Sequence, residues 1–246
     1  MLDRLGVELP VVQAGMGGGI AGHRLAAAVS EAGGLGTIGM PAPGAGSIAA
    51  ELQSARELTV RPLAVNLLLP FATGGDFRAA AQADALITFW GRPRRRTDGV
   101  WLHQCGSVGE AGAALRAGAD GVIMQGVEAG GHVRGTILAL ELLAAARRDL
   151  HGEPALWLAG GIAERTDVVE ALDAGAEAAV LGTRFLLSEE SGAQDAYRER
   201  LLAAPQTQVT ELFGLGWPSA PHRVVPNAAT RRWTSRDPRG PGRCGP

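Results

Sequence analysis

A repeated unit constrains the fold more than any other feature of the sequence. Residues 115–126 (LRAGADGVIMQG) and 172–183 (LDAGAEAAVLGT) share one pattern, in which the end of a helix is followed by a glycine turn and a short apolar run. Residues 32–39 carry a weaker copy. A glycine after a helix is typical of a left-handed cap, and a short apolar run is typical of a buried parallel strand. The repeat therefore predicts an α/β fold of alternating helices and strands.

Apolar runs recur eight times along the chain, and each predicts one strand. They lie at residues 11–16, 35–39 (closed by Pro41 and Pro43), 63–69, 85–90, 100–105, 122–125, 155–159 and 178–181. Helical patterns connect most of them, at residues 24–32, 47–58, 76–83, 108–117, 136–149 and 165–174. Eight strands that alternate with helices predict a closed (β/α)8 barrel.

The crossovers on both sides of the strand at 85–90 look shortened. The helix before it spans only about residues 76–83, and residues 91–99 are too few and too rich in Pro and Gly for a crossover helix. This connector holds Arg92, Arg94, Arg95 and Arg96. We interpret the arginines as a solvated connector rather than as a binding site.

Length and composition suit one barrel with a short extension. The chain has 246 residues, of which 46% are hydrophobic and 20% charged, which predicts a sizeable core. We expect residues 1–190 to form the barrel and residues 191–234 to form a small helical and irregular segment packed on it, with a helix at 194–203. Residues 235–246 are rich in Pro, Gly and Arg, and we expect a disordered tail there.

Several classes of protein are disfavoured. A net charge of -2 gives no electrostatic case for binding nucleic acid or an anionic membrane. Two cysteines, Cys105 and Cys244, cannot form a disulfide framework or a spaced thiolate metal site. No apolar run approaches the roughly 20 residues of a membrane helix, and the first residues lack a signal-peptide pattern. We expect a cytoplasmic protein without a metal, and the sequence leaves open whether it is a homo-oligomer.

Two glycine loops predict a phosphate site. Ligands of (β/α)8 barrels gather at the carboxyl ends of the strands, and phosphate commonly binds after strands seven and eight. Here Gly160 and Gly161 follow the seventh strand, and Gly182 and Thr183 follow the eighth. Glycines expose backbone N–H groups, the start of a following helix favours an anion, and Thr183 can donate its hydroxyl. Gly17–Gly19 lacks the spacing of a dinucleotide-binding fingerprint.

A third loop, after the strand at 122–125, carries four glycines around His132. Gly126, Gly130, Gly131 and Gly135 require a tight turn or a close approach to a ligand, because ordering glycine costs the most backbone freedom. A histidine held there can act as an acid or base near neutral pH. A surface turn with an incidental histidine is the alternative that this stretch alone leaves open.

Together these segments resemble the nitronate monooxygenases, formerly called 2-nitropropane dioxygenases, which are FMN-dependent (β/α)8 enzymes. The likeness runs from about residue 7 to residue 190 and is most specific around the AGGH of residues 129–132. It rests on residues 13–18, Asn66, and residues 125–132, 159–162 and 181–185, with a further likeness at 213–218. The resemblance implies an FMN whose phosphate lies at Gly160, Gly161, Gly182 and Thr183, beside Leu181, and whose ring is lined by Met16, Asn66, Gln125 and Gly130.

The resemblance also implies a reaction. His132 would take the α-proton of a neutral nitroalkane or position an anionic nitronate, and flavin and O2 would complete oxidation to a carbonyl compound and nitrite. Glu128 either orients His132 or faces water. Gln104 and Ser107 either reach the pocket or bond to the barrel rim. The other histidines are interpreted as structural or surface residues: His23, His103, His151 and His222.

Two other functions remain open. The first is an NAD(P)H-dependent flavin reductase of the enoyl-acyl-carrier-protein reductase or quinone reductase type, which resembles the chain at the same loop; Ala129 favours the monooxygenases. The second is a flavin-binding barrel with impaired catalysis. It is suggested because the chain is shorter than typical members, at the crossovers flanking strand four and at the C-terminus. Gly15 also stands where many members have Pro.

Overall fold

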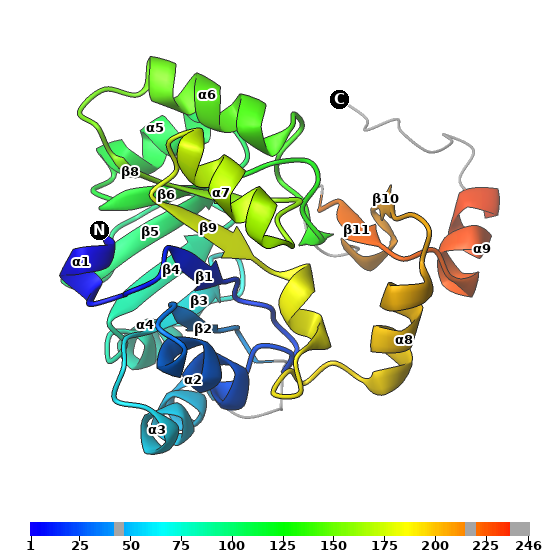
Figure 1. The fold of residues 1–246 in the computed structure, drawn as a ribbon, viewed down its shortest axis with the longest axis horizontal. Helices are drawn as coiled ribbons and strands as arrows, with labels where there is room; N and C mark the ends of the chain where they lie inside the picture. The colour runs from blue at the N-terminus through cyan, green and yellow to red at the C-terminus, as the bar shows by residue number, and fades with distance from the viewer. Residues whose placement is uncertain (42–46, 215–219, 237–246) are drawn as a thin grey trace.

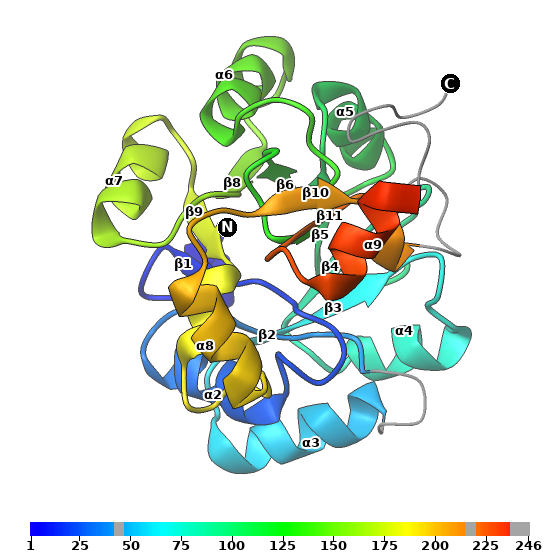
Figure 2. The ribbon, with the colours of Figure 1, turned by 90° about the vertical axis from the view of Figure 1, so that its right-hand side faces the viewer.

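Eight parallel strands close into a barrel in the computed structural model, which describes residues 1–41, 47–214 and 220–236 (Figures 1 and 2). The strands follow the order β1-β9-β8-β6-β5-β4-β3-β2. A parallel bridge between Val12 and Leu35 joins the two ends of this order, and the N–H of Gln13 donates to the carbonyl of Leu35 at 2.9 Å. The predicted (β/α)8 barrel is confirmed.

Every predicted strand is present, and three of them have the predicted bounds. The barrel strands are β1 (Val11–Gln13), β2 (Gly36–Ile38), β3 (Leu63–Leu68), β4 (Ala85–Phe89), β5 (Val100–Cys105), β6 (Gly121–Gln125), β8 (Ala155–Ala159) and β9 (Ala178–Leu181). The first strand ends three residues earlier than predicted. Pro43, predicted to close the second strand, lies outside the described residues.

Helices surround the barrel, as Figure 2 shows. They are α2 (His23–Glu31), α3 (Ile48–Leu58), α4 (Gly74–Ala80), α5 (Val108–Arg116), α6 (Ala139–Asp149) and α7 (Arg165–Asp173). Gly33, Gly118 and Gly175 follow α2, α5 and α7 with φ of 91°, 94° and 96°, so the left-handed turns predicted from the repeat are confirmed. Each turn reverses the chain into the next strand.

The barrel interior is a packed core. One buried cluster draws side chains from the strands around the barrel, including Val12, Ile87, Ile123 and Trp157. Helix α1 (Leu2–Leu5) and Val7 pack against the same cluster and cover the amino ends of the strands. The opposite end, where the strands finish, is therefore the end available for a site.

The crossovers around β4 are short, as predicted. Helix α4 has seven residues, and residues 91–99 connect β4 to β5 without a helix. Arg95 donates to the carbonyls of Gly118 and Gly99 and to Asp120 Oδ2, while the Arg96 guanidinium lies 5.1 Å from the centre of the Phe77 ring. The connector arginines thus cover a side of the barrel that a helix would otherwise cover.

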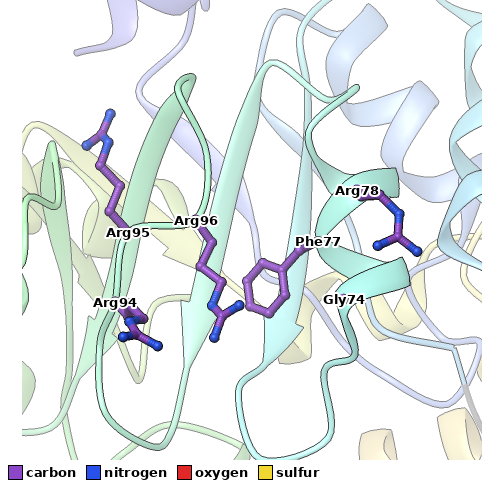
Figure 3. Close-up of a pocket in the computed structure, with 6 residues that line it drawn as sticks. All are labelled: Gly74, Phe77, Arg78, Arg94, Arg95 and Arg96. Atoms are coloured by element: carbon purple, nitrogen blue, oxygen red, sulfur yellow. The ribbon is translucent and has the colours of Figure 1, made fainter.

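Between α4 and this connector lies an open hollow of about 460 Å³ (Figure 3). It is lined by Gly74, Phe77, Arg78, Arg94, Arg95 and Arg96. Asp120, the partner of Arg95, directly precedes the amino end of β6. The hollow therefore lies on the side of the barrel, and its lining includes none of the residues of the glycine loops.

The C-terminal segment differs from the predicted helical extension. After η1 (Thr183–Leu187) and α8 (Asp195–Ala203), the chain forms β10 (Gln208–Thr210), η2 (Leu212–Gly214) and β11 (His222–Val224), then α9 (Ala228–Arg236). β10 and β11 pair antiparallel, and β11 pairs in turn with β7 (Gly131–His132). Strand pairing between distant segments has no local sequence signal, so the hairpin was missed. Ser235 and Arg236 belong to α9 rather than to a disordered tail, and residues 237–246 lie outside the described residues.

The hairpin lies at the carboxyl end of the barrel. In Figure 1 β10, β11 and α9 lie on the side of the barrel opposite α1, and in Figure 2 they lie toward the viewer, in front of the barrel strands. Ala220, just before β11, packs with Phe89 and Trp90 at the end of β4. Within the described part of the chain, no helix is long and apolar enough to cross a membrane.

His103 lies on the outer side of β5 and is a buried structural residue, as the sequence suggested. It is 3% exposed, and its Nδ1 lies 2.8 Å from the Thr88 hydroxyl, which also accepts the indole N–H of Trp101. Burial is the main cause that lowers the pKa of His103 to about 4. The folded protein therefore resists protonation of this ring.

We expect the stability of the protein to fall as the pH drops from about 6.5 to 4. Between these pH values His103 binds a proton in the unfolded chain but stays neutral in the folded protein. The free energy of unfolding therefore falls by on the order of 3 kcal/mol over this pH range. His103→Asn should flatten the dependence of the unfolding free energy on pH, measured by urea unfolding at several pH values. His151→Asn, at an exposed position, is the control. Equal slopes in both variants would rule out this role for His103.

Candidate active site

Polar side chains gather inside the carboxyl rim of the barrel. Asn66 on β3, Gln104 on β5 and Gln125 on β6 each lie two residues beyond an interior core residue, and alternation along a strand puts them on the same inward side. Asn66 is 5% exposed and Gln125 is 4% exposed. The rim is therefore the polar layer of an otherwise apolar interior.

Gln125 holds the glycine loop that carries His132. Its amide nitrogen donates to the carbonyl of His132 at 2.9 Å, and its amide oxygen accepts the N–H of Arg134 at 2.8 Å. Both polar ends of the side chain are thus engaged by the loop backbone. The sequence reasoning expected Gln125 to line the flavin; the structure gives it a part in fixing the position of His132.

Two aromatic rings from distant parts of the chain lie against His132. The Trp90 ring lies edge-on at 6.1 Å between ring centres, and the His222 ring, from β11, lies at 3.5 Å. Trp90 has a φ of 63°, a left-handed conformation that is rare for a bulky residue and typical of functional sites. Burial, and then the neighbouring charge of His222, lower the pKa of His132 to about 3. The imidazole is therefore uncharged at neutral pH and has a nitrogen lone pair that can accept a proton.

His222 was interpreted from the sequence as a structural or surface residue, and the structure shows that it is buried beside His132. It is 8% exposed and is paired in register with His132. Burial also lowers its pKa, against the opposing effect of a hydrogen bond to the carbonyl of Ala220. Trp90 was missed as well, although a tryptophan followed by Gly91 at a strand end was a signal that could have been used.

Glu128 is hydrogen-bonded to the start of α6 rather than to His132. Both of its carboxylate oxygens lie 3.0 Å from the N–H of Ala139, the first residue of α6. A carboxylate at this position caps the helix and interacts favourably with its positive end. Ser107 is similarly engaged at the start of α5, where its hydroxyl accepts the N–H of Glu110. Both residues are therefore engaged at the start of a helix.

The glycine loops meet at one place on the rim. A Cβ at Gly130 would lie 2.5 Å from the Thr183 hydroxyl, so the His132 loop and the loop after β9 are in close contact. Gly160 and Gly161 have φ of 115° and 75°, and a Cβ at Gly160 would press on the backbone of Gly126 and Ala129 at 3.3 Å. Among the described residues, the N–H groups of Gly160, Gly161 and Gly182 donate to no backbone carbonyl. This cradle fits a phosphate group.

The start of α7, the helix after the Gly160–Gly161 loop, was expected to help bind an anion. The N–H groups of Ala163 and Glu164 donate to Asp167, and Glu164 completes the capping box at the start of α7. Acidic side chains thus already engage part of the N–H groups at the amino end of α7. An anion at this rim would depend on the glycine loops and on Thr183.

The remaining expected residues differ in their roles. Met16 is half-buried and packs against Leu25 and Val29 of α2. Leu181 belongs to the cluster between strands and outer helices, so that its backbone, but not its side chain, lies at the rim. Gly15 lies against Asn66, because a Cβ at Gly15 would stand 2.2 Å from the Asn66 Cβ. In the described ranges, no group of three or more His, Cys, Asp or Glu could hold a metal ion.

Comparisons with known sequences agree with this arrangement. The family model described as nitronate monooxygenase matches residues 1–97 and 93–239. A nitronate monooxygenase of Pseudomonas aeruginosa is 31% identical over 295 residues, covering 93% of this chain and 82% of that protein. A Mycobacterium tuberculosis protein, (3aS,4S,5R,7aS)-5-hydroxy-7a-methyl-1-oxo-octahydro-1H-indene-4-carboxyl-CoA dehydrogenase, is 32% identical over 240 residues, covering 92% of this chain. The chain spans 65% of the length of that relative.

Two solved structures are similar in fold to this chain over most of its length. FabK from Thermotoga maritima superimposes with a TM-score of 0.83 and 31% identity, over 94% of this chain and 75% of that chain. Nitroalkane oxidase from Streptomyces ansochromogenes superimposes with a TM-score of 0.79 and 31% identity, over 94% of this chain and 80% of that chain. The similarity therefore extends over the barrel and the C-terminal segment together.

Proposed function

Because the chain belongs to the nitronate monooxygenase family, a family of oxidoreductases, we propose that it binds FMN and oxidises alkyl nitronates with O2 to a carbonyl compound and nitrite. The observation that carries the proposal is the contact between the His132 loop and the glycine cradle, at Gly130 and Thr183. It joins a base to an anion site at the carboxyl end of one barrel. Such a juxtaposition suits a phosphorylated cofactor with its reactive part toward the histidine.

The residues of the cradle would hold the phosphate of FMN. Gly160, Gly161 and Gly182 offer backbone N–H groups, and Thr183 offers its hydroxyl. Electron transfer and reaction with O2 are the chemistry that a bound flavin supplies. Asn66 and Gln104 present amide groups from the inner wall of the barrel, where they would help to orient the bound molecules.

His132 is the residue that would handle the proton. With a neutral nitroalkane as substrate, the α-proton passes to the lone pair of the imidazole, and the electron pair of the C–H bond stays on the nitronate formed. With an anionic nitronate no proton needs to be removed, and the neutral ring can orient the substrate by hydrogen bonding. The β10–β11 hairpin covers this part of the rim and limits the access of water.

A second candidate is an NAD(P)H-dependent flavin reductase. The observation that favours it is the likeness to FabK, whose TM-score of 0.83 is comparable with the 0.79 for nitroalkane oxidase. The named relatives also include a CoA-thioester dehydrogenase. A third, a flavin-binding barrel with impaired catalysis, follows from the shortened crossovers.

The test is an absorbance spectrum of the purified protein, followed by anaerobic addition of propyl nitronate and then of NADPH. A flavin spectrum that bleaches with the nitronate is the expected result. Bleaching by NADPH alone would transfer the assignment to the reductase. A flavin that neither reagent reduces would favour the impaired barrel, and a protein that takes up no FMN on reconstitution would contradict the cofactor assignment itself.

A further inference from the structure

The C-terminal hairpin builds one wall of the histidine site. β11 lies antiparallel to β7, with His222 opposite His132, and the N–H of Val133 donates to the carbonyl of Pro221 at 2.9 Å. β10 supports β11 from its other edge, through the pairing of Thr210 with His222. The position of the His222 ring is therefore fixed by backbone pairing on both sides.

The two imidazoles are in direct ring contact. Their centres are 3.5 Å apart and their planes are inclined by 54°. The His222 Nδ1 lies 3.1 Å from the carbonyl oxygen of Ala220, and because a carbonyl oxygen only accepts, the neutral ring carries its proton on Nδ1. Two imidazolium ions at this separation would repel strongly, so the pair holds one proton far more readily than two.

The charged groups around the pair are engaged elsewhere. On the His132 loop, the Arg134 guanidinium lies over Trp90 at 4.8 Å and donates to Glu110 Oε1 at 2.8 Å. On β11, Arg223 donates to the carbonyl of Val127 at 2.6 Å and to Thr207 at 3.1 Å. Glu211 is next in sequence to Thr210, the residue of β10 that pairs with His222. Both arginines are thus held by hydrogen bonds to other groups.

We propose that His222 is a positioning residue of the active site, whose ring packs against His132 and keeps that imidazole uncharged and in one orientation. The proposal rests on the function proposed for His132 and deepens it. The substrate proton still goes to His132. His222 touches neither the substrate nor the cofactor in this role, and acts by excluding water from one face of the His132 ring and by resisting a second positive charge.

Two substitutions separate packing from charge. His222→Phe keeps an aromatic ring against His132 but removes the titrating group, whereas His222→Ala removes both. His151→Ala, at an exposed position remote from the hairpin in sequence, is the matched control. The first readout is the NMR titration of the His132 ring in the protein without added substrate, which does not depend on turnover.

The expected titration is distinct for each protein. In the wild type the His132 and His222 signals titrate as a coupled pair at low pH. In His222→Phe, His132 should titrate in a single step at a higher pH, and in His222→Ala its midpoint should rise further, by about one pH unit or more above wild type. Circular dichroism identifies any variant that has not folded. If His132 titrates in both folded variants as in His151→Ala, the proposal is wrong.

The second readout is the pH profile of turnover. For a neutral nitroalkane, the acid limb of kcat/KM should move to higher pH in both variants, so that the loss of kcat/KM relative to wild type grows as the pH falls toward the titration midpoint of His132 and is larger in His222→Ala. Oxidation of the anionic nitronate should change much less. Equal losses for both substrates at every pH would overturn the proposal and leave His222 a structural role. If the wild type oxidises neither substrate, the proposed function fails while the NMR titration still decides the role of His222.

Discussion

His132→Ala is expected to keep its flavin and to lose turnover of neutral nitroalkanes, with kcat/KM reduced about 10²- to 10⁴-fold. The neutral His132 ring lies within the enclosure formed by Trp90 and His222, and its lone pair can accept the α-proton of the substrate. Oxidation of a pre-formed nitronate should fall far less, since that substrate has already lost its proton. Steady-state kinetics with each substrate, and the flavin absorbance of the variant, measure both effects.

The pH dependence should follow from the low pKa of His132, about 3. Because the folded-state pKa is depressed, the neutral base is present above it and is lost only as the pH falls toward about 3. Wild-type activity on neutral nitroalkanes should therefore persist well below the ordinary histidine pKa of about 6.5. Unchanged turnover of neutral nitroalkanes in His132→Ala would remove this residue from the role of base.

Gly160→Ala is expected to weaken FMN binding at least about tenfold. Its φ of 115° is unfavourable for alanine, and the added methyl group would stand 3.3 Å from backbone atoms of Gly126 and Ala129, inside the cradle. The dissociation constant of FMN, measured by fluorescence titration of the cofactor-free protein, is the direct test.

Gly152→Ala provides the matched control for this substitution. Gly152 also has a positive φ, of 84°, but a Cβ there would meet no atom within 4 Å. Both variants should lose about 1 to 3 kcal/mol of stability from backbone strain, whereas only Gly160→Ala should lose FMN affinity. Equal FMN affinities in the two variants would show that the loop after β8 does not hold the cofactor.

Local patterns in the sequence predicted most of the fold. The strands are short apolar runs, and the turns before them contain glycines such as Gly118 and Gly175, whose left-handed conformations are confirmed. Both signals depend only on residues a few positions apart, so they can be interpreted without tertiary information. The short crossovers beside β4 were predicted on the same grounds.

The environment of His132 could be predicted only in part. The glycine loops identified where a site would lie, because parallel strands all finish at one end of a barrel. What encloses the histidine comes from residues distant in sequence, including Trp90 and His222, and no local pattern reports such contacts. Glu128 was misjudged for a related reason, since its partner is the first N–H of a helix that begins at Ala139.

The pairing of β11 with β7 has a consequence for the order in which the molecule is made. The last barrel strand ends at Leu181, whereas the strand that pairs with the histidine loop begins at His222, 90 residues after His132. A ribosome therefore delivers all eight barrel strands before it delivers the strand that encloses the base. During synthesis the barrel core can form first. His132 becomes enclosed, and its pKa is lowered by burial, only after the β10–β11 hairpin has been made.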